Sequence, residues 1–384
     1  MLLNSLHHKL HKWRERGLIR KLRVMTQSND DNVIYLEQKR YVNFASNDYL
    51  GLSRDNEVIE AAYKGSLAEG LGSGSSLFIS GSRPIHNLLE KEIANWLDRE
   101  KVLLFPSGFQ ANIAAVQTLA DRKSVVVADK LIHNSLITGI QSTGAKLIRF
   151  LHNNPVDLEK KLSKLYDSNK SLLVIIESLY SMEGTIAPIN EIIKISKKYN
   201  ANLLVDEAHA LGVVGEDGKG LSYGFKDGIQ VISGTFGKAF GSGGAFLACN
   251  KTICEKIIQT SGAFRYTTAL SPSLAAGALL SLNKIKDNKS WGSELLSFSQ
   301  QWKKEIIKAT DFLVKGDCHI ISMIIGSEDK TISVQKHLEK NGFLAVAIRP
   351  PTVPIGQSRI RLTIKKTLNN EILNNFISIL KDYK

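Results

Sequence analysis

The sequence predicts an α/β protein with a large domain on a mostly parallel, seven-stranded sheet and a small α+β domain after it. Short apolar, β-branched runs alternate with helical patterns through the middle of the chain, which is typical of a parallel sheet buried on both faces. The chain has 384 residues, enough to bury one large core and a smaller one. A polar, charged stretch at 283–293 then interrupts the alternation and indicates a boundary between domains.

The strands of the large sheet are expected where short apolar runs end in a turn or a polar residue. They are the segments 101–105, 124–128, 146–150, 172–177, 201–206, 229–233 and 245–248. Helices fill the intervals between them. One begins after Pro84 and has apolar residues at helical spacing, which we expect to be buried: Leu88, Leu89, Ile93, Trp96 and Leu97. Another follows Gly108.

The part of the chain after residue 293 changes from alternating units to a compact α+β pattern. Strands are expected at 318–325, 343–347 and 359–363, with helices at 328–341 and 369–381. We therefore divide the chain into a basic helical arm (1–45), a large α/β domain that binds the ligand (46–285) and a small α+β domain (286–384).

The N-terminal arm is strongly basic and amphipathic. Its first 23 residues contain one acid, Glu15, and seven bases: Lys9, Lys12, Arg14, Arg16, Arg20, Lys21 and Arg23. Leu3, Leu6, Leu10 and Trp13 recur at helical spacing. Such a segment suits a transit peptide, a membrane-surface helix or an arm that packs on the body of the fold. The last is favoured, because no small-residue cleavage site follows.

Composition narrows the classes of partner. The net charge is +13, but beyond the arm the Lys and Arg residues are scattered and are not interleaved with aromatic residues, so an anionic small molecule fits better than a nucleic acid. The longest apolar runs are too short to cross a membrane. Three cysteines without paired spacing predict neither a disulfide framework nor a cysteine metal centre. We expect a cytoplasmic protein with no metal and no membrane partner.

The first candidate site is a turn between a strand and a helix, FPSGFQAN at 105–112. The amides of Gly108 and Phe109 would lie at a helix N-terminus, where backbone N–H groups bind phosphate. Such turns are common, so this pattern alone does not distinguish a phosphate site from an ordinary connection.

The second candidate is ANLLVDEAHALG, in which Asp206 ends a buried strand and His209 follows on the loop. A buried carboxylate needs a cationic or hydrogen-bonding partner, and a protonated pyridine nitrogen would serve. A metal pair and a structural carboxylate are the alternatives, although no further ligand cluster supports the metal.

The third candidate is VISGTFGKAFGSGG at 231–244, a glycine-dense loop with Lys238 at its centre. A lysine presented by such a loop suits a Schiff-base lysine, whose amine must lose its proton near neutral pH. The loop is not a Walker loop, because it lacks both the glycine interval and the Ser or Thr after the lysine. A surface lysine is the alternative.

The fourth candidate is AIRPPTVPIGQSRIRLT at 347–363. Two prolines stiffen the chain after Arg349, which could then bind a substrate carboxylate through two hydrogen bonds. Arg359 and Arg361 follow on the next strand. Surface salt bridges are the alternative for these arginines.

The order of these four segments resembles that of fold type I pyridoxal-phosphate enzymes, and the chain is similar to the α-oxoamine synthase family over nearly its whole length. The segments that carry the resemblance are NFASNDYLGLS (43–53), GSGSSLFISG (72–81), HNLLEKEIANWL (86–97), SLYSMEGTIAPI (178–189), VDEAHALGVVGEDGKG (205–220), TFGKAFGSGGA (235–245) and IRPPTVP (348–354).

The resemblance implies roles in binding the cofactor, pyridoxal 5'-phosphate. Lys238 would attach it, Asp206 would pair with its ring nitrogen, His209 would hydrogen-bond its phenolic oxygen, and His133 would stack on its ring with Ser181 beside it. The phosphate would be bound by Gly108, Phe109 and Thr235, and by Thr267 and Thr268 of a partner subunit. The resemblance therefore implies a homodimer with shared active sites, in which Lys238, His133, Asp206 and His209 are catalytic.

On the substrate side, Asn47, Arg349 and Thr352 match positions of the family, and Arg20 would approach the acyl chain. The chain is most similar to the members that condense L-alanine with a pimeloyl thioester, with loss of carbon dioxide, in biotin biosynthesis. The carrier of the acyl group could be coenzyme A or an acyl carrier protein. Glu207 after Asp206, and the bulky pair Leu77-Phe78, depart from the family's usual pattern.

Two alternatives remain at this point. Sister synthases that make 2-amino-3-ketobutyrate, 5-aminolevulinate or 3-ketosphinganine share the cofactor residues, although the first two usually have Tyr-Pro where this chain has Arg349-Pro350-Pro351. A non-catalytic pyridoxal-phosphate-binding sensor would normally have a DNA-binding helix-turn-helix, for which the arm is too short.

Overall fold

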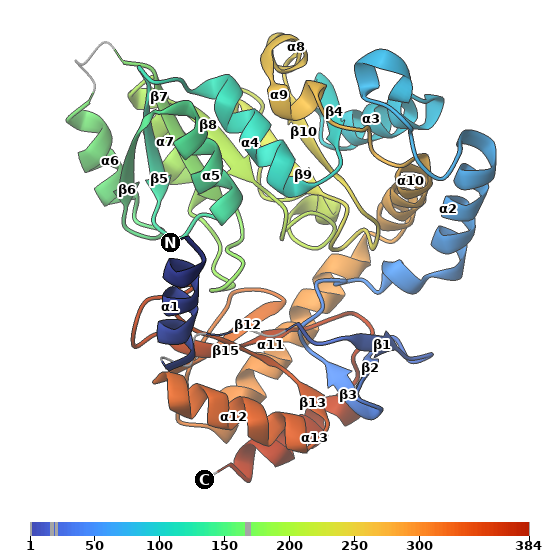
Figure 1. Ribbon diagram of the computed structural model, residues 1–384, viewed down its shortest axis with the longest axis vertical. Coiled ribbons are helices and arrows are strands. Elements are labelled where there is room, and N and C mark those ends of the chain that lie inside the picture. The colour runs from blue at the N-terminus through green and yellow to red at the C-terminus, as the bar shows by residue number, and fades with distance from the viewer. Residues whose placement is uncertain (1, 16–18, 20–21, 166–169, 384) are drawn as a thin grey trace.

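The computed structural model describes residues 2–15, 19, 22–165 and 170–383 (Figure 1). Its largest element is a seven-stranded sheet in the order β4-β10-β9-β8-β7-β5-β6. The strands are β4 (Lys101–Phe105), β5 (Val125–Asp129), β6 (Lys146–Phe150), β7 (Leu172–Glu177), β8 (Asn202–Asp206), β9 (Val231–Thr235) and β10 (Ala245–Cys249). Five neighbouring strands, β9 to β6, pair in parallel, and β10 is antiparallel to both β4 and β9. The predicted mostly parallel, seven-stranded sheet is confirmed.

The sheet is buried on both faces, because successive side chains of its strands enter two different cores. On β5, Val125 and Val127 belong to one core and Val126 and Ala128 to the other. The first core is covered by α3 (Pro84–Trp96), α6 (Pro155–Ser163), α7 (Ile189–Lys198) and α10 (Pro272–Asp287). The second is covered by α4 (Gly108–Leu119), α5 (Asn134–Thr143), α8 (Lys251–Thr260) and α9 (Gly262–Arg265).

One core position on α3 was predicted wrongly. Leu89, Ile93, Trp96 and Leu97 are buried as expected, but Leu88 is 46 % exposed. Leu89, Ile93 and Trp96 lie at i, i+4 and i+7 and form the inward face of the helix, from which Leu88 is rotated by one residue.

The large sheet and its helices form the upper half of the molecule in Figure 1, and the C-terminal part forms the lower half. The remaining elements of the upper half are short or lie at its edge. They are η1 (Leu52–Arg54), α2 (Asn56–Glu69), a π-helix (Leu77–Gly81) and η4 (Glu216–Gly218). The polar stretch 283–293, at which we propose the domain boundary, covers the last turn of α10, which ends at Asp287, the two residues after it and the first turn of α11 (Ser290–Ala309). The division at 285/286 therefore lies within α10.

The C-terminal part forms a four-stranded sheet in the order β11-β12-β15-β14. Its elements after α11 are β11 (Leu313–Lys315), β12 (Ile320–Gly326), α12 (Glu328–Lys340), β13 (Phe343–Leu344), β14 (Val346–Ile348), β15 (Ser358–Thr363) and α13 (Asn370–Lys381). The single strand predicted at 343–347 is two strands, because the chain leaves one sheet and enters another at the buried Ala345: β13 pairs with β3 and β14 pairs with β15.

The N-terminal segment is only partly helical, which corrects the helical arm predicted over 1–45. It contains α1 (Leu2–Glu15) and then β1 (Met25–Gln27), β2 (Val33–Leu36) and β3 (Lys39–Asn43), which complete a sheet with β13. Glu37 and Gln38 between β2 and β3 both have positive φ (50° and 65°), as tight two-residue hairpin loops require. Both faces of this hairpin contain buried side chains: Val33 pairs with Val42 on one face, and Ile34 pairs with Tyr41 on the other.

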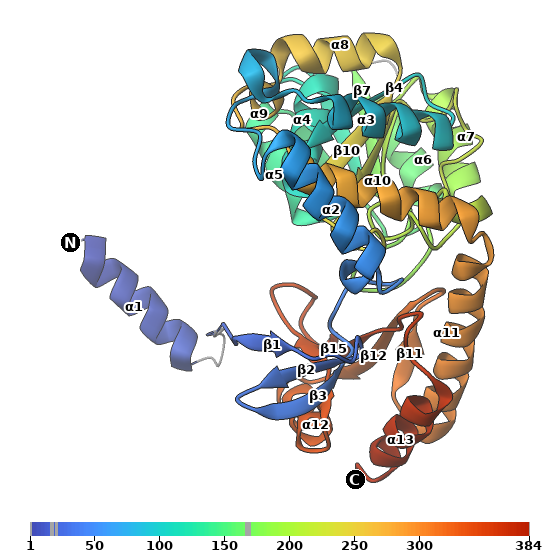
Figure 2. The same ribbon diagram turned by 90° about the vertical axis from the view of Figure 1, so that its right-hand side faces the viewer.

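The arm was also expected to pack on the body of the fold, and the described residues of α1 do not do so. Leu3, Leu6, Leu10 and Trp13 are all exposed, and α1 stands away from both halves in Figure 2. No described helix has the length and apolar character needed to cross a membrane.

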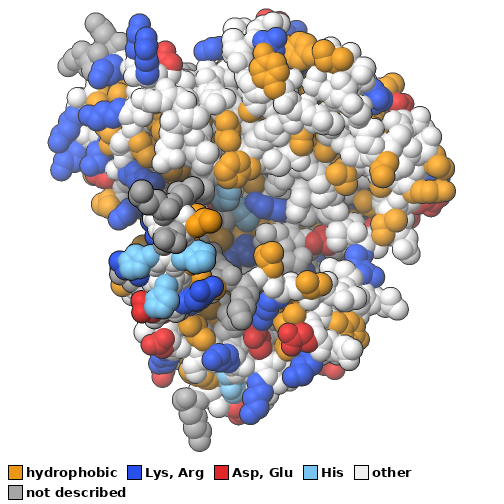
Figure 3. Space-filling model, viewed as in Figure 1, with side chains coloured by type: hydrophobic (Ala, Val, Ile, Leu, Met, Phe, Trp, Pro, Cys, Tyr) orange, Lys and Arg blue, Asp and Glu red, His pale blue; other side chains and the backbone are white. Residues whose placement is uncertain are grey.

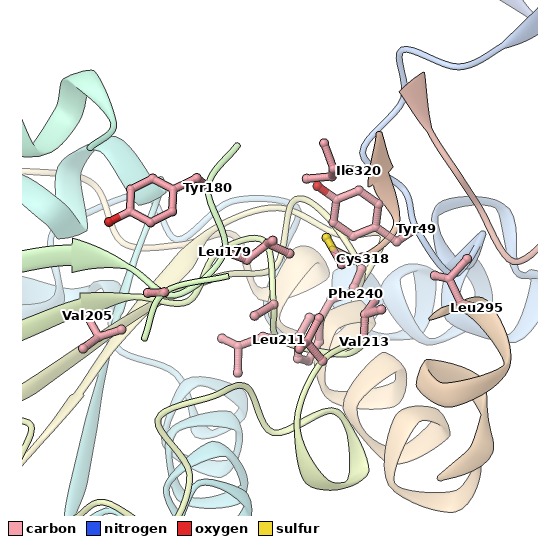
Figure 4. Close-up of a cluster of buried hydrophobic side chains, with 14 of the residues drawn as sticks. Tyr49, Leu179, Tyr180, Val205, Leu211, Val213, Phe240, Leu295, Cys318 and Ile320 are labelled. Atoms are coloured by element: carbon pink, nitrogen blue, oxygen red, sulfur yellow. The ribbon is translucent and has the colours of Figure 1, made fainter. Parts of the chain in front are cut away.

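The two halves share one apolar core. Tyr49 lies beside Cys318 and Ile320 of the lower half, and Leu211 and Phe240 face them from the upper half (Figure 4). Below this region, Trp302 of α11 is fully buried against Phe44 and Phe376, with ring centroids 5.3 and 5.5 Å away. This shared core fixes the carboxyl ends of the large sheet next to the C-terminal part.

Candidate active site

A cavity of about 210 Å³ lies at the carboxyl ends of β4, β7, β8 and β9, where open α/β sheets place their ligand sites. The structure brings together here seven of the residues predicted from the sequence: Gly108, Phe109, His133, Asp206, His209, Thr235 and Lys238. Four further residues complete the lining: Asn112, Ser135, Glu177 and Ala208.

One end of the cavity suits a phosphate. Ser107 caps α4, with its hydroxyl oxygen accepting a hydrogen bond from the amide of Gln110 at 3.3 Å. The amides of Gly108 and Phe109 come next and have no partner within the helix, so they and the helix dipole favour an anion. Thr235 faces them: a Cβ added at Gly108 would lie 3.8 Å from that of Thr235.

The other end is acidic. Asp206 is the last residue of β8, and each of its carboxylate oxygens accepts one N–H group: Oδ2 from Asn112 Nδ2 at 2.8 Å and Oδ1 from the amide of Ala208 at 3.0 Å. A carboxylate held in this way can bind a ring N–H as an additional charge-assisted partner.

Lys238 enters the cavity from a tightly folded loop. The amide of Gly241 donates to the carbonyl of Lys238 and the amide of Ser242 to that of Phe236, both at 2.9 Å. Gly241 has φ 61°, and a Cβ there would collide with the backbone of Leu52 and Ser53. The glycines therefore shape the loop.

The surroundings of Lys238 make its amine easier to deprotonate. Burial lowers the pKa of Lys238 to about 8, and the charges of Asp206 and Glu177 oppose this effect. The side chain still keeps part of its surface open to the cavity. A useful fraction of the amine is therefore unprotonated near neutral pH, as a nucleophile or a base requires.

His209 is held by Tyr49, which sequence reasoning did not single out. Tyr49 Oη lies 2.5 Å from His209 Nδ1. Burial raises the pKa of the Tyr49 hydroxyl, and burial, followed by the charge of Lys238, lowers the pKa of His209 well below its usual range. Both groups are therefore neutral, and one hydrogen bond joins Tyr49 Oη to His209 Nδ1. Tyr49 Oη also lies 3.4 Å from Asn47 Oδ1.

A second, larger cavity of about 600 Å³ adjoins the first and shares His133 with it. Ser181, predicted to lie beside the cofactor, lines this second cavity, as does Thr352, predicted to bind substrate. Its other lining residues include Lys130, Ile137, Arg149, Met182 and Val353.

The remaining predicted residues are placed outside the two cavities. Asn47 is half-buried and its Oδ1 accepts from Arg361 Nη2 at 3.1 Å. Arg349 is half-buried and is not among the residues that line either cavity. Thr267 and Thr268 line neither cavity of their own chain, and Arg20 lies outside the described residues.

Arg361 is the clearest functional candidate that the sequence analysis did not assign. It is buried, and its guanidinium donates to three neutral oxygens: Ser181 O (2.7 Å), Thr363 Oγ1 (3.0 Å) and Asn47 Oδ1 (3.1 Å). Among the described ion pairs, none includes Arg361, whereas Arg359 pairs with Glu183 at 3.0 Å. Two arginines at i and i+2 in an apolar strand were the available signal, because a buried charge needs a partner.

The fold and the site define the class: a helix start suited to phosphate, a carboxylate suited to a ring nitrogen and a lysine of lowered pKa are the features of a fold type I pyridoxal-phosphate enzyme. The chain belongs to the aminotransferase class I and II family, whose model matches residues 39–380. Among the described residues, no group of three His, Cys, Asp or Glu side chains is placed to hold a metal ion.

Curated relatives and solved structures narrow the likeness within that family. The chain is 34 % identical to 8-amino-7-oxononanoate synthase of Lysinibacillus sphaericus, over 96 % of this chain and 94 % of that one. Serine palmitoyltransferase of Sphingomonas wittichii is similar in structure, with a TM-score of 0.92, 26 % identity and coverage of 98 % and 96 %. The 8-amino-7-oxononanoate synthase of Francisella tularensis has a TM-score of 0.75, 27 % identity and coverage of 89 % and 97 %. The predicted likeness to α-oxoamine synthases is confirmed.

Proposed function

We propose that the protein is a pyridoxal-phosphate-dependent acyltransferase that condenses L-alanine with a pimeloyl thioester to give 8-amino-7-oxononanoate, carbon dioxide and a free thiol, in biotin biosynthesis. The observation that supports it best is the pair of cavities that meet at His133, one suited to the cofactor and one large enough for an acyl chain. When bound, pyridoxal phosphate supplies an electron sink for the charge that develops on the substrate Cα.

The chain's own residues then have distinct tasks. Lys238 would hold the cofactor covalently, and its free amine would then be the base for the Cα proton of the substrate. Asp206 would keep a proton on the ring nitrogen, and His209 would hydrogen-bond the phenolic oxygen. The amides of Gly108 and Phe109 bind the phosphate.

The larger cavity is the proposed site of the acyl thioester. Its lining combines apolar side chains such as Ile132, Ile137 and Val353 with Lys130 and Arg149, both exposed. The bases suit the phosphates of coenzyme A and also the acidic surface of an acyl carrier protein. The proposal therefore includes both coenzyme A and an acyl carrier protein as carriers of the acyl group.

A homodimer is part of the proposal. Leu71, Ile79 and Tyr266 are between 78 % and 81 % exposed, and hydrophobic patches are visible over the upper half in Figure 3. A second copy that covers them would remove apolar surface from water and bring Thr267 and Thr268 to the phosphate of its neighbour. The proposed location is the cytoplasm. The three cysteines are buried and free, as is usual in a reducing compartment.

The test is one assay of L-alanine, glycine and L-serine, each against pimeloyl, acetyl, succinyl and palmitoyl thioesters, with thiol release as the measurement. We expect the highest kcat/KM for L-alanine with a pimeloyl thioester. The likeness to serine palmitoyltransferase makes L-serine with a palmitoyl thioester the second candidate, and a preference for that pair would replace the proposal. Absence of thiol release with every pair would favour a non-catalytic binding protein.

A further prediction concerns the substrate carboxylate. Like Arg349, Arg361 lines neither cavity, but it lacks an acidic partner among the described ion pairs and lies near Lys238 and His209, whose pKa values its charge lowers. Arg361→Lys is expected to raise the L-alanine concentration needed for half-saturation about ten- to a hundredfold, because lysine lacks the planar fork that binds a carboxylate through two hydrogen bonds. Titration of the cofactor's visible absorption with L-alanine measures this.

Arg349→Lys provides the comparison, because the sequence analysis assigned the same contact to Arg349. A smaller shift is expected from Arg349→Lys than from Arg361→Lys. A large shift in Arg349→Lys together with a parent-like titration in Arg361→Lys would restore the assignment made from the sequence.

A further inference from the structure

A chain of hydrogen bonds joins two of the predicted cofactor contacts through residues to which no role has been given. Asn112 Nδ2 lies 2.8 Å from Asp206 Oδ2 and 2.9 Å from Ser135 Oγ, and Ser135 Oγ lies 2.8 Å from His133 Nδ1. Asn112 is 3 % exposed and Ser135 is fully buried. All four side chains line the smaller cavity.

The direction of the first two bonds is fixed by chemistry. Asn112 Oδ1 is buried and accepts no hydrogen bond in the described chain. Turning the amide over would place this oxygen against the carboxylate of Asp206, so the nitrogen must face it. The two N–H groups of Asn112 are therefore donated to Asp206 and to Ser135.

The direction of the third bond follows from His133. The backbone amide of Ser135 also points at His133 Nδ1, at 3.3 Å, and can only donate. Nδ1 is therefore an acceptor, and the Ser135 hydroxyl donates its single proton to it. Burial of part of the ring lowers the pKa of His133, which favours the neutral ring with its proton on Nε2.

We propose that Asn112 is a positioning residue that holds Asp206 and, through Ser135, sets the tautomer of His133. This inference rests on the proposed cofactor site. Asn112 lies one turn after Gly108 on α4, so the same rigid helix carries the phosphate amides and the side chain that orients the two ring contacts. The side-chain amide of Asn112 donates one N–H group to Asp206 and one to Ser135, and it does not ionise near neutral pH. It therefore holds Asp206 and His133 without carrying a proton from one to the other.

The experiment compares four variants by two measurements. Asn112→Ala removes both donors, Asn112→Asp keeps the shape, Ser135→Ala removes only the link to His133, and Ser135→Thr restores the hydroxyl. The first measurement is the dissociation constant of pyridoxal 5'-phosphate titrated into apoenzyme. The second is the ¹⁵N shift of the His133 ring nitrogens, in apoenzyme and holoenzyme, assigned by their loss in His133→Gln.

A matched control exists on the same pair of helices. Gln117 of α4 donates to Ser142 Oγ of α5 at 3.0 Å, on the exposed side and away from the cavity. Gln117→Ala therefore removes an amide-to-serine bond of the same kind between the same helices, and both measurements are expected to match the parent.

Asn112→Ala and Asn112→Asp are each expected to weaken cofactor binding about tenfold or more, because Asp206 loses a charge-assisted donor or gains a like charge. Asn112→Ala should also mix the His133 tautomers, because Ser135 loses the bond that fixes its hydroxyl. Ser135→Ala should mix the tautomers and leave the dissociation constant within about twofold of the parent. Ser135→Thr should restore the parent pattern. If Asn112→Ala does not fold, Asn112→Asp and the two Ser135 variants decide the outcome.

Three results would overturn the proposal: a proton on His133 Nδ1 in the parent, parent-like cofactor affinity in both Asn112 variants, or equal loss of affinity in Ser135→Ala and the Asn112 variants. Failure of the proposed function has a different signature. In that case the parent would release no thiol or would prefer another substrate pair, while the dissociation constant of pyridoxal phosphate and the ¹⁵N shifts would still report on the bonds of Asn112 and Ser135.

Discussion

Lys238→Ala is expected to abolish covalent attachment of pyridoxal phosphate and all thiol release. Among the residues that the structure describes, Lys238 alone brings an amine to the lining of the smaller cavity, and burial lowers its pKa to about 8, which makes it reactive near neutral pH. The parent should be yellow, and borohydride reduction followed by peptide mapping should place the cofactor on the peptide that contains Lys238. The variant should remain unlabelled.

Lys226→Ala is the control for this prediction. Lys226 is an exposed lysine that pairs with Asp98 at 2.6 Å, and it lines neither the smaller nor the larger cavity. Labelling of this variant should match the parent. A label on any other lysine of the parent would show that the site has been assigned wrongly.

Asp206→Asn is expected to leave the fold intact and to slow removal of the alanine Cα proton about a thousandfold or more. A neutral amide cannot hold a proton on the ring nitrogen, so the ring no longer takes up charge from Cα, and a charge-assisted pair is lost. Exchange of the L-alanine Cα proton in deuterium oxide, followed by NMR, measures the step directly.

Glu177→Gln is the matched comparison, because Glu177 ends the strand next to that of Asp206 and lies opposite it in register. Burial and the charge of Asp206 raise the pKa of Glu177 well above its usual range. Because Glu177 has no assigned contact with the ring nitrogen, its replacement by an amide should change the exchange rate only severalfold. Near-parent exchange in Asp206→Asn, or equal losses in both variants, would contradict the role of Asp206.

The strands of the large sheet could be predicted within two residues at each end, because strands covered on both faces are nearly continuous apolar runs. The N-terminal hairpin could not. Its strands are three to five residues long, and β3 gains its other neighbour from Phe343 and Leu344, about 300 residues later. No local pattern contains that pairing.

The candidate site likewise contains residues that a local sequence pattern locates and residues whose role depends on distant parts of the chain. Asp206 ends its strand, and Gly108 and Lys238 come three residues after theirs, so the strand pattern locates them. Tyr49 and Asn112 depend on partners 160 and 94 residues away, His209 and Asp206. Arg361 is distinguished by the absence of an acid among its described partners, which becomes visible only when three segments of chain meet around it.

The position of β10 in the large sheet has a consequence for how the protein folds during synthesis. β4 is an edge strand whose single neighbour is β10, so residues 101–105 have no strand to pair with until the ribosome has made Cys249. The phosphate amides follow β4, and Lys238 lies on the loop that leads into β10. Strands β5 to β9 can assemble earlier from nearby segments, whereas this late, long-range pairing raises the contact order of the site. The binding pocket is therefore the last part of the sheet to form, and a chain arrested before residue 245 would leave β4 as an unpaired apolar segment available to chaperones.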